Sequence, residues 1–80
     1  MRSDDTVSQF QRAVAAEVRA EMARRKVSQT DVAQWLGVAQ ATVSRRVTGE
    51  VAFDVAELEK IAALLGVAVQ QFIPNHVAAA

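Results

Sequence analysis

The chain has 80 residues, of which 51% are hydrophobic, and its nine basic residues balance nine acidic ones. This length allows one domain with one small core, and the lack of cysteine excludes disulfides and thiolate metal ligation. No apolar run approaches the roughly 18 residues of a membrane span, and the N-terminus lacks the apolar core of a signal peptide. We therefore expect a soluble, cytoplasmic protein.

Apolar residues recur at helical spacing, and no alternating run flanks a hairpin turn, so an all-α fold is expected. Residues 1–5 are predicted to form a flexible arm. A first helix is predicted from Thr6 or Ser8 to about Arg25. Its apolar stripe, at spacings of three and four, consists of Val7, Phe10, Val14, Val18 and Met22.

Two short helices follow, separated by a glycine turn. The first covers residues 29–36, and Ser28 with Asp31 forms a capping-box pattern at its start. Gly37 stands where this helix must end, because glycine adopts a positive φ without steric cost. The second helix covers residues 40–47 and carries mostly polar and basic side chains. This arrangement is typical of a helix-turn-helix, which lays its second helix in the major groove of DNA.

A second capping-box pattern, Asp54 with Glu57, opens a fourth helix that ends at Gly66. A fifth helix of one or two turns is predicted over residues 69–73, and a short tail over residues 75–80. The expected core consists of Val18, Met22, Val32, Val43, Val47, Leu58, Ile61 and Leu65.

One family pattern runs through residues 28–73. Its matching positions are Ser28, Gln29, Val32, Ala33, Gly37, Val38, Thr42, Val43, Ser44, Arg45, Gly49, Leu58, Ile61, Ala62, Leu65, Gly66, Val67 and Phe72. With these residues the chain resembles the Cro/C1-type (Xre) family of phage and bacterial repressors. The resemblance implies a compact, five-helix, lambda-repressor-like domain over residues 6–74. It also implies a transcriptional regulator, a small repressor or Cro-like protein, that binds a double-stranded DNA operator sequence-specifically.

The resemblance also indicates which side chains meet DNA. The expected base-reading residues are Gln40, Ala41, Ser44 and Arg45. Glutamine can bond adenine, arginine can bond guanine, and an alanine methyl suits the methyl group of thymine. The expected phosphate contacts are Gln29, Thr42, Arg46 and Thr48. Gln29 is the first residue of its helix, and the backbone N–H groups at that helix N-terminus would bind the same phosphate.

The charge is unevenly distributed although its sum is zero. Residues 24–49 hold five basic residues and one acidic residue, a net charge of +4, whereas residues 50–80 carry −3. Arg45, Arg46 and one or two of Arg24, Arg25 and Lys26 are therefore expected near phosphates. The acidic Glu57 and Glu59 are expected to face away from the duplex. Alternatively, residues 24–26 only complement the dipole of the first helix at its C-terminus.

The chain departs from the family pattern in two places. Ala39 stands where a capping Ser or Thr is usual, at a cost of about 1 kcal/mol. Met22 and Val47 occupy the positions of a buried Arg–acid pair that several phage repressors of the family contain. Such a replacement by apolar residues is often neutral or stabilising.

No catalytic site, metal or cofactor is expected, because one histidine and scattered carboxylates form no nucleophile–base pair. No small-molecule ligand is evident either, and His76 is interpreted as a tail residue. Small modules of this type usually bind paired half-sites as two-fold dimers. A homodimer of this chain would use the fifth helix, the tail or the extended first helix, with Phe72, Ile73 and Val77 as the apolar candidates, and the sequence leaves a monomer open as the alternative. The alternative function is an antitoxin or adaptor that uses the same fold for protein–protein interaction, which the zero net charge and the missing cap favour.

Overall fold

The structure is a computed structural model that describes residues 3–74, with side chains from residue 9 onward. Its elements, in chain order, are α1 (Ser3–Arg25), α2 (Gln29–Leu36), α3 (Gln40–Val47), α4 (Val55–Leu65) and a 3-10 turn, η1 (Val69–Phe72). These residues contain no strand, so the all-α prediction is confirmed within residues 3–74.

The expected count of five α-helices is not met, because the fifth element is a 3-10 turn of four residues. Ala68 precedes it and provides no side-chain cap. Pro74 follows it and disfavours helical backbone at the residue before. Ile73 accordingly has the extended values φ −96° and ψ 120°. The short turn therefore ends one residue earlier than predicted.

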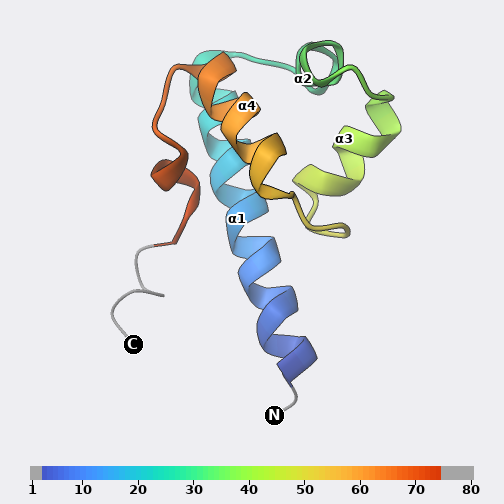
Figure 1. Cartoon of the computed structure of the whole chain (residues 1–80), viewed down its shortest axis with the longest axis vertical. Helices are drawn as coiled ribbons and strands as arrows, with labels where there is room; N and C mark the ends of the chain where they lie inside the picture. The colour runs from blue at the N-terminus through green and yellow to red at the C-terminus, as the bar shows by residue number, and fades with distance from the viewer. Residues whose placement is uncertain (1–2, 75–80) are drawn as a thin grey trace.

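Helix α1 is the spine of the molecule (Figure 1). At about 1.5 Å per residue its 23 residues extend roughly 35 Å, which accounts for most of the 38 Å long axis. Helix α4 packs beside the C-terminal half of α1, and the α2–α3 pair lies on one side of them (Figure 1). The N-terminal turns of α1 project beyond the other helices (Figure 1).

The first helix begins at Ser3 rather than at Thr6 or Ser8, so residues 3–5 of the expected arm are helical. The sequence offers a physical reason: Asp4 and Asp5 stand in the first turn, where negative charge complements the helix dipole.

Both predicted capping boxes form. Ser28 Oγ accepts from the Asp31 N–H at 3.0 Å, and the Ser28 N–H donates to Asp31 Oδ2 at 2.9 Å. At α4 the corresponding distances between Asp54 and Glu57 are 2.7 and 3.0 Å. As expected, Ala39 makes no side-chain cap at the start of α3. These local bonds explain why α2 and α4 begin where the sequence predicts.

Three helices end in the same way, with a left-handed residue followed by a valine. The left-handed residues are Lys26, Gly37 and Gly66, at φ 57°, 72° and 73°. The following valine in each case donates its N–H to the carbonyl five residues earlier, at 3.0 Å. This is the Schellman pattern, which satisfies a terminal carbonyl of the helix. Lys26 is the member of the set that bears a side chain at an unfavourable φ.

The core lies where α1, α2, α3, α4 and η1 converge, and all eight residues predicted to be buried are buried. Met22 and Val47, the proposed substitutes for an ion pair, are 6% and 1% exposed. Phe10 was expected on the buried stripe of α1 but is 38% exposed, because it lies toward the projecting end of the helix. Phe72, expected at the surface, is fully buried.

Candidate nucleic-acid interface

Helix α3 has one buried side and one outer side. Val43 and Val47, four residues apart, are each only 1% exposed and anchor the helix in the core. Gln40, Ala41 and Arg45 are exposed, and Ser44 is half-buried. The four side chains predicted to read bases are thus all accessible to some degree, on a helix whose opposite side is fixed.

One of these side chains is held by a neighbouring helix. The hydroxyl of Thr30, in the first turn of α2, donates to Gln40 Oε1 at 3.3 Å. A carbonyl oxygen has two lone pairs, so Gln40 keeps accepting capacity and both amide hydrogens for a ligand. Thr30 was missed at the sequence level, since its contact crosses the turn between two helices and follows no helical periodicity.

The residues predicted to contact phosphate have less uniform surroundings. Gln29 and Thr42 are half-buried. The Thr48 hydroxyl donates to the Arg45 carbonyl at 3.0 Å and accepts from the Glu50 N–H at 3.4 Å, so it already stabilises the turn after α3. The phosphate-binding role of these residues stays a prediction.

Arg46 forms a two-point ion pair with Glu57 of α4. Its Nε lies 3.0 Å from Glu57 Oε1 and its Nη2 lies 3.2 Å from Oε2. The hydrogen bond to Glu57 raises the pKa of Arg46 above its already high ordinary value, against the opposing effect of burial. Glu57 therefore faces α3, contrary to expectation, because the geometry that caps α4 also brings its carboxylate within reach of Arg46. Any phosphate must compete with this carboxylate for Arg46.

Two further basic residues are also bound within the fold. Glu21 on α1 is only 7% exposed, and its two oxygens each lie 2.6 Å from a guanidinium, one of Arg24 and one of Arg25. Arg25 also donates through Nε to the Leu65 carbonyl at 2.7 Å. Leu65 ends α4, beside the end of α1 and away from α3 (Figure 1). Two of the three candidates among Arg24, Arg25 and Lys26 are thus paired with Glu21, and whether one or two of them contact phosphate stays a prediction.

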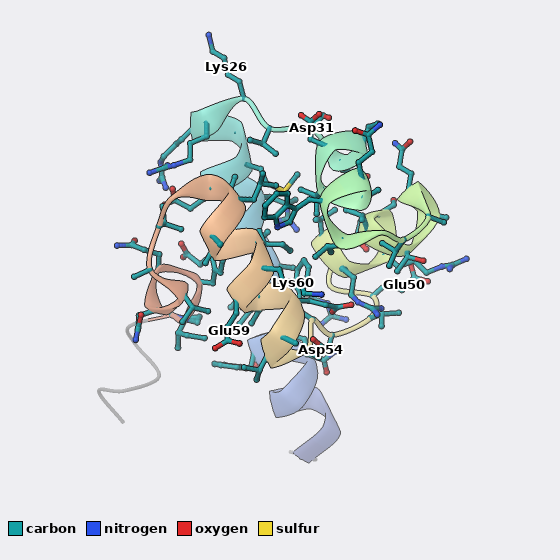
Figure 2. The ribbon with its side chains drawn as sticks, turned by 45° about the horizontal axis from the view of Figure 1, so that its top comes forward. Lys26, Asp31, Glu50, Asp54, Glu59 and Lys60 are labelled. Carbon is teal, nitrogen blue, oxygen red and sulfur yellow. The ribbon has the colours of Figure 1, made fainter. Side chains whose placement is uncertain are left out.

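Lys26, the third basic residue beside Arg24 and Arg25, points outward from the end of α1 (Figure 2). The acidic Glu50 lies near α3 (Figure 2). Glu59 lies on the side of α4 away from α3 (Figure 2), and its orientation relative to a duplex stays a prediction.

Two arginines of α1, absent from the predicted site, lie at the C-terminal end of α3. Arg19 donates through Nη1 to the Val47 carbonyl. Arg12 packs against the turn, so closely that a Cβ built on Gly49 would lie 3.0 Å from Arg12 Cα. Positive charge complements the negative end of the α3 dipole here. Part of the positive charge near the C-terminal end of α3 thus comes from α1. Because α1 is distant from α3 in sequence, no local pattern predicted this.

The remaining predictions concern partners and cofactors. Phe72 packs inside the core and offers no surface to a partner, because its side chain fills the space between η1, α1 and α4. Ile73 is 40% exposed. His76 and Val77 lie outside the described residues. Over residues 3–74, no three His, Cys, Asp or Glu side chains gather as a metal site. None of the described helices has the length and apolarity to cross a membrane.

Comparison with known proteins agrees with this geometry. A family model described as a helix-turn-helix domain matches residues 13–72, which are 60 of the 80 residues. No curated protein and no solved structure matches the chain. The matched range contains the α2–turn–α3 unit together with the parts of α1, α4 and η1 that bury its inner side. The chain belongs to the helix-turn-helix domain family, a family of DNA-binding domains.

Proposed function

We propose that this chain is a sequence-specific transcriptional regulator, a small cytoplasmic repressor of the Cro/C1 type, that reads an operator with α3. The observation that carries the proposal is the two-sided character of α3. Val43 and Val47 fix its inner side, while Gln40 and Arg45 stand on the outer side with Gln40 held by Thr30. A fixed helix with exposed amide and guanidinium groups is suited to hydrogen-bonding base edges.

Each side chain has a chemical counterpart in the major groove. Gln40 would pair with adenine through its amide, and Arg45 would pair with guanine O6 and N7. Ala41 would lie against a thymine methyl, and Ser44 would add a hydrogen bond to either type of base pair. Because Thr30 occupies one lone pair of Gln40 Oε1, it restricts the orientation of the amide and so sharpens the preference for adenine.

Selection of binding sites from random duplex DNA at moderate salt tests this function. A defined motif is expected. Arg45→Ala should then cost roughly 1–3 kcal/mol and relax preference at one base pair, whereas Gln29→Ala should weaken binding to all sequences alike. Arg24→Ala is the matched control, because Arg24 pairs with Glu21 away from α3. Equal, uniform losses for Arg45→Ala and Gln29→Ala would contradict the division into base and phosphate contacts.

The ion pairs change the expected salt dependence. Five basic residues of 24–49 suggested two to four ionic contacts per protomer, but Arg24, Arg25 and Arg46 bind carboxylates within the fold. Arg45 and either Arg12 or Arg19 of α1 remain available to phosphate, which gives about one or two ionic contacts per protomer. The slope of log affinity against log salt should therefore be about −1 to −2 per protomer. A slope near −4 per protomer would mean that DNA displaces the internal carboxylates.

The same ion pairs favour the second candidate, an antitoxin or adaptor, because they leave little positive charge for nonspecific attraction to DNA. The two functions predict different outcomes of the selection experiment. Recovery of no enriched sequence, with the fold intact, would favour the protein-binding function.

A further inference from the structure

The Arg46–Glu57 ion pair joins two helices whose backbones do not pack directly against each other. Helix α3 packs on α1 and α2, whereas α4 packs on α1, α2 and η1. The inner side of α3 is already anchored by Val43 and Val47, each 1% exposed. The side chains of Arg46 and Glu57 keep 22% and 17% of their surface accessible, and ion pairs that water can reach add little to stability. Packing of the core therefore does not explain the pair.

The carboxylate of Glu57 is also held in place by its own helix. Glu57 Oε1 accepts from the Asp54 N–H at 3.0 Å, and the Glu57 N–H donates to Asp54 Oδ1 at 2.7 Å. These capping-box bonds fix the side chain at the start of α4. The same carboxylate receives Arg46 Nε at 3.0 Å and Arg46 Nη2 at 3.2 Å. Because the acceptor is positioned in advance, the pair forms at a smaller entropic cost than one between two mobile side chains.

Glu57 occupies one bidentate edge of Arg46 and neutralises its charge. A planar guanidinium pairs in this two-point manner with carboxylate and with phosphate alike. Arg46 lies four residues after Thr42, so the two half-buried side chains share one side of α3, and Thr42 is itself an expected phosphate contact. Arg45, one position earlier, is exposed. A DNA backbone that passes along the side of Thr42 would therefore meet an arginine whose charge is already compensated.

We infer that Glu57 masks Arg46 from phosphate and so lowers the sequence-independent affinity of the chain for DNA. The inference rests on the proposed function, because it names a residue that regulates binding at the same helix. Phosphate contacts strengthen binding to every sequence alike, whereas base contacts distinguish one sequence from another. A regulator with one phosphate contact fewer is retained less by the many nonspecific sites that compete with its operator.

The affinity for a duplex of random sequence, measured across a salt series, tests the masking. Glu57→Gln keeps an oxygen for the Asp54 N–H, since glutamine also completes a capping box, but it removes the charge that binds Arg46. One more neutralised phosphate should steepen the slope of log affinity against log salt by about 0.9, which is about a 3- to 4-fold larger loss of affinity between about 50 and 200 mM salt. Glu59→Gln is the matched control. It changes the net charge equally, and Glu59 is exposed on the side of α4 away from α3 (Figure 2).

A steeper slope in Glu57→Gln but not in Glu59→Gln supports the inference. Equal slopes in wild type and a folded Glu57→Gln overturn it, as does equal steepening in both variants, which would reflect net charge alone. Absence of binding by every variant overturns it as well. Should Glu57→Gln fail to fold, the wild-type chain decides. The nuclear magnetic resonance signal of Arg46 Nε–H should then stay unchanged when the random duplex is added, and a shift of that signal overturns the masking.

The random duplex contains no selected operator, so this result is separate from the test of the proposed function. A steeper slope in Glu57→Gln without any enriched motif would support the masking and refute sequence-specific binding. An enriched motif with equal slopes would refute the masking and leave the proposed function standing.

Discussion

The turn after α3 provides a quantitative test of how the recognition helix is anchored. Gly49 has φ +85°, and a Cβ added there would lie 3.0 Å from both Cα and Cγ of Arg12. The Arg12 Cα belongs to the backbone of α1 and cannot move without displacing the helix. Gly37 has a similar φ, +72°, but a Cβ there would meet nothing within 4 Å. The two glycines therefore separate backbone strain from steric contact.

The cost of each substitution follows from these surroundings. Alanine at a left-handed position costs roughly 1–2 kcal/mol, which is the whole expected effect of Gly37→Ala. Gly49→Ala adds the overlap with α1, for which overpacking costs of about 1–3 kcal/mol are typical, giving a total of about 2–5 kcal/mol. A domain of this size has a total stability of only about 4–12 kcal/mol, so the variant should be severely destabilised.

Urea unfolding followed by far-ultraviolet circular dichroism measures both free energies. We expect Gly49→Ala to lose about 1–3 kcal/mol more than Gly37→Ala, the difference being the Arg12 contact. Equal losses would refute the claim that α1 packs rigidly against the turn after α3.

Three further predictions concern the core, a capping box and a helix end. Leu58→Ala should cost about 2–5 kcal/mol in urea unfolding, because Leu58 is only 7% exposed, and a cost below 1 kcal/mol would contradict its place in the core. The backbone N–H of Ser28, and to a smaller extent its side chain, lowers the pKa of Asp31 below its ordinary 3.8. The stabilisation contributed by the ionised Asp31 carboxylate should thus be complete above pH 3.8 and be lost as the pH falls through the lowered pKa. Asp31→Asn should flatten this dependence of the urea midpoint on pH. Lys26→Gly should stabilise the chain by about 0.5–1 kcal/mol, because relief of strain at φ 57° exceeds the entropic cost of glycine; an unchanged melting temperature would contradict it.

Local signals in the sequence predicted most of the fold. Helices α2 and α3 have the predicted bounds, and α4 begins immediately after Asp54. Capping boxes and glycines act over three or four residues, so they can be recognised without knowledge of the tertiary structure. The periodicity of α1 predicted which face is buried but not how far its neighbours extend along it. Phe10 is therefore on the predicted stripe and yet exposed.

The candidate site was harder to predict where partners come from other elements. Arg46 and Glu57 are eleven residues apart, and Arg19 and Val47 are 28 residues apart. These pairs depend on how the helices pack, which a count of local charge does not capture. The sequence located the positive charge within residues 24–49 correctly as a sum, but it did not show that Arg24, Arg25 and Arg46 are paired with carboxylates of α1 and α4.

Mapping amide chemical shifts while the isotopically labelled chain is titrated with its selected duplex tests the central claim most directly. The account predicts the largest changes along α3 from Gln40 to Arg45 and in the first turn of α2 at Gln29 and Thr30. Residues of η1 should change little, because η1 contacts α1 and α4 but neither α2 nor α3. Large changes centred on η1 or on the exposed Trp35, with α3 unaffected, would contradict the assignment of α3 as the helix that reads DNA.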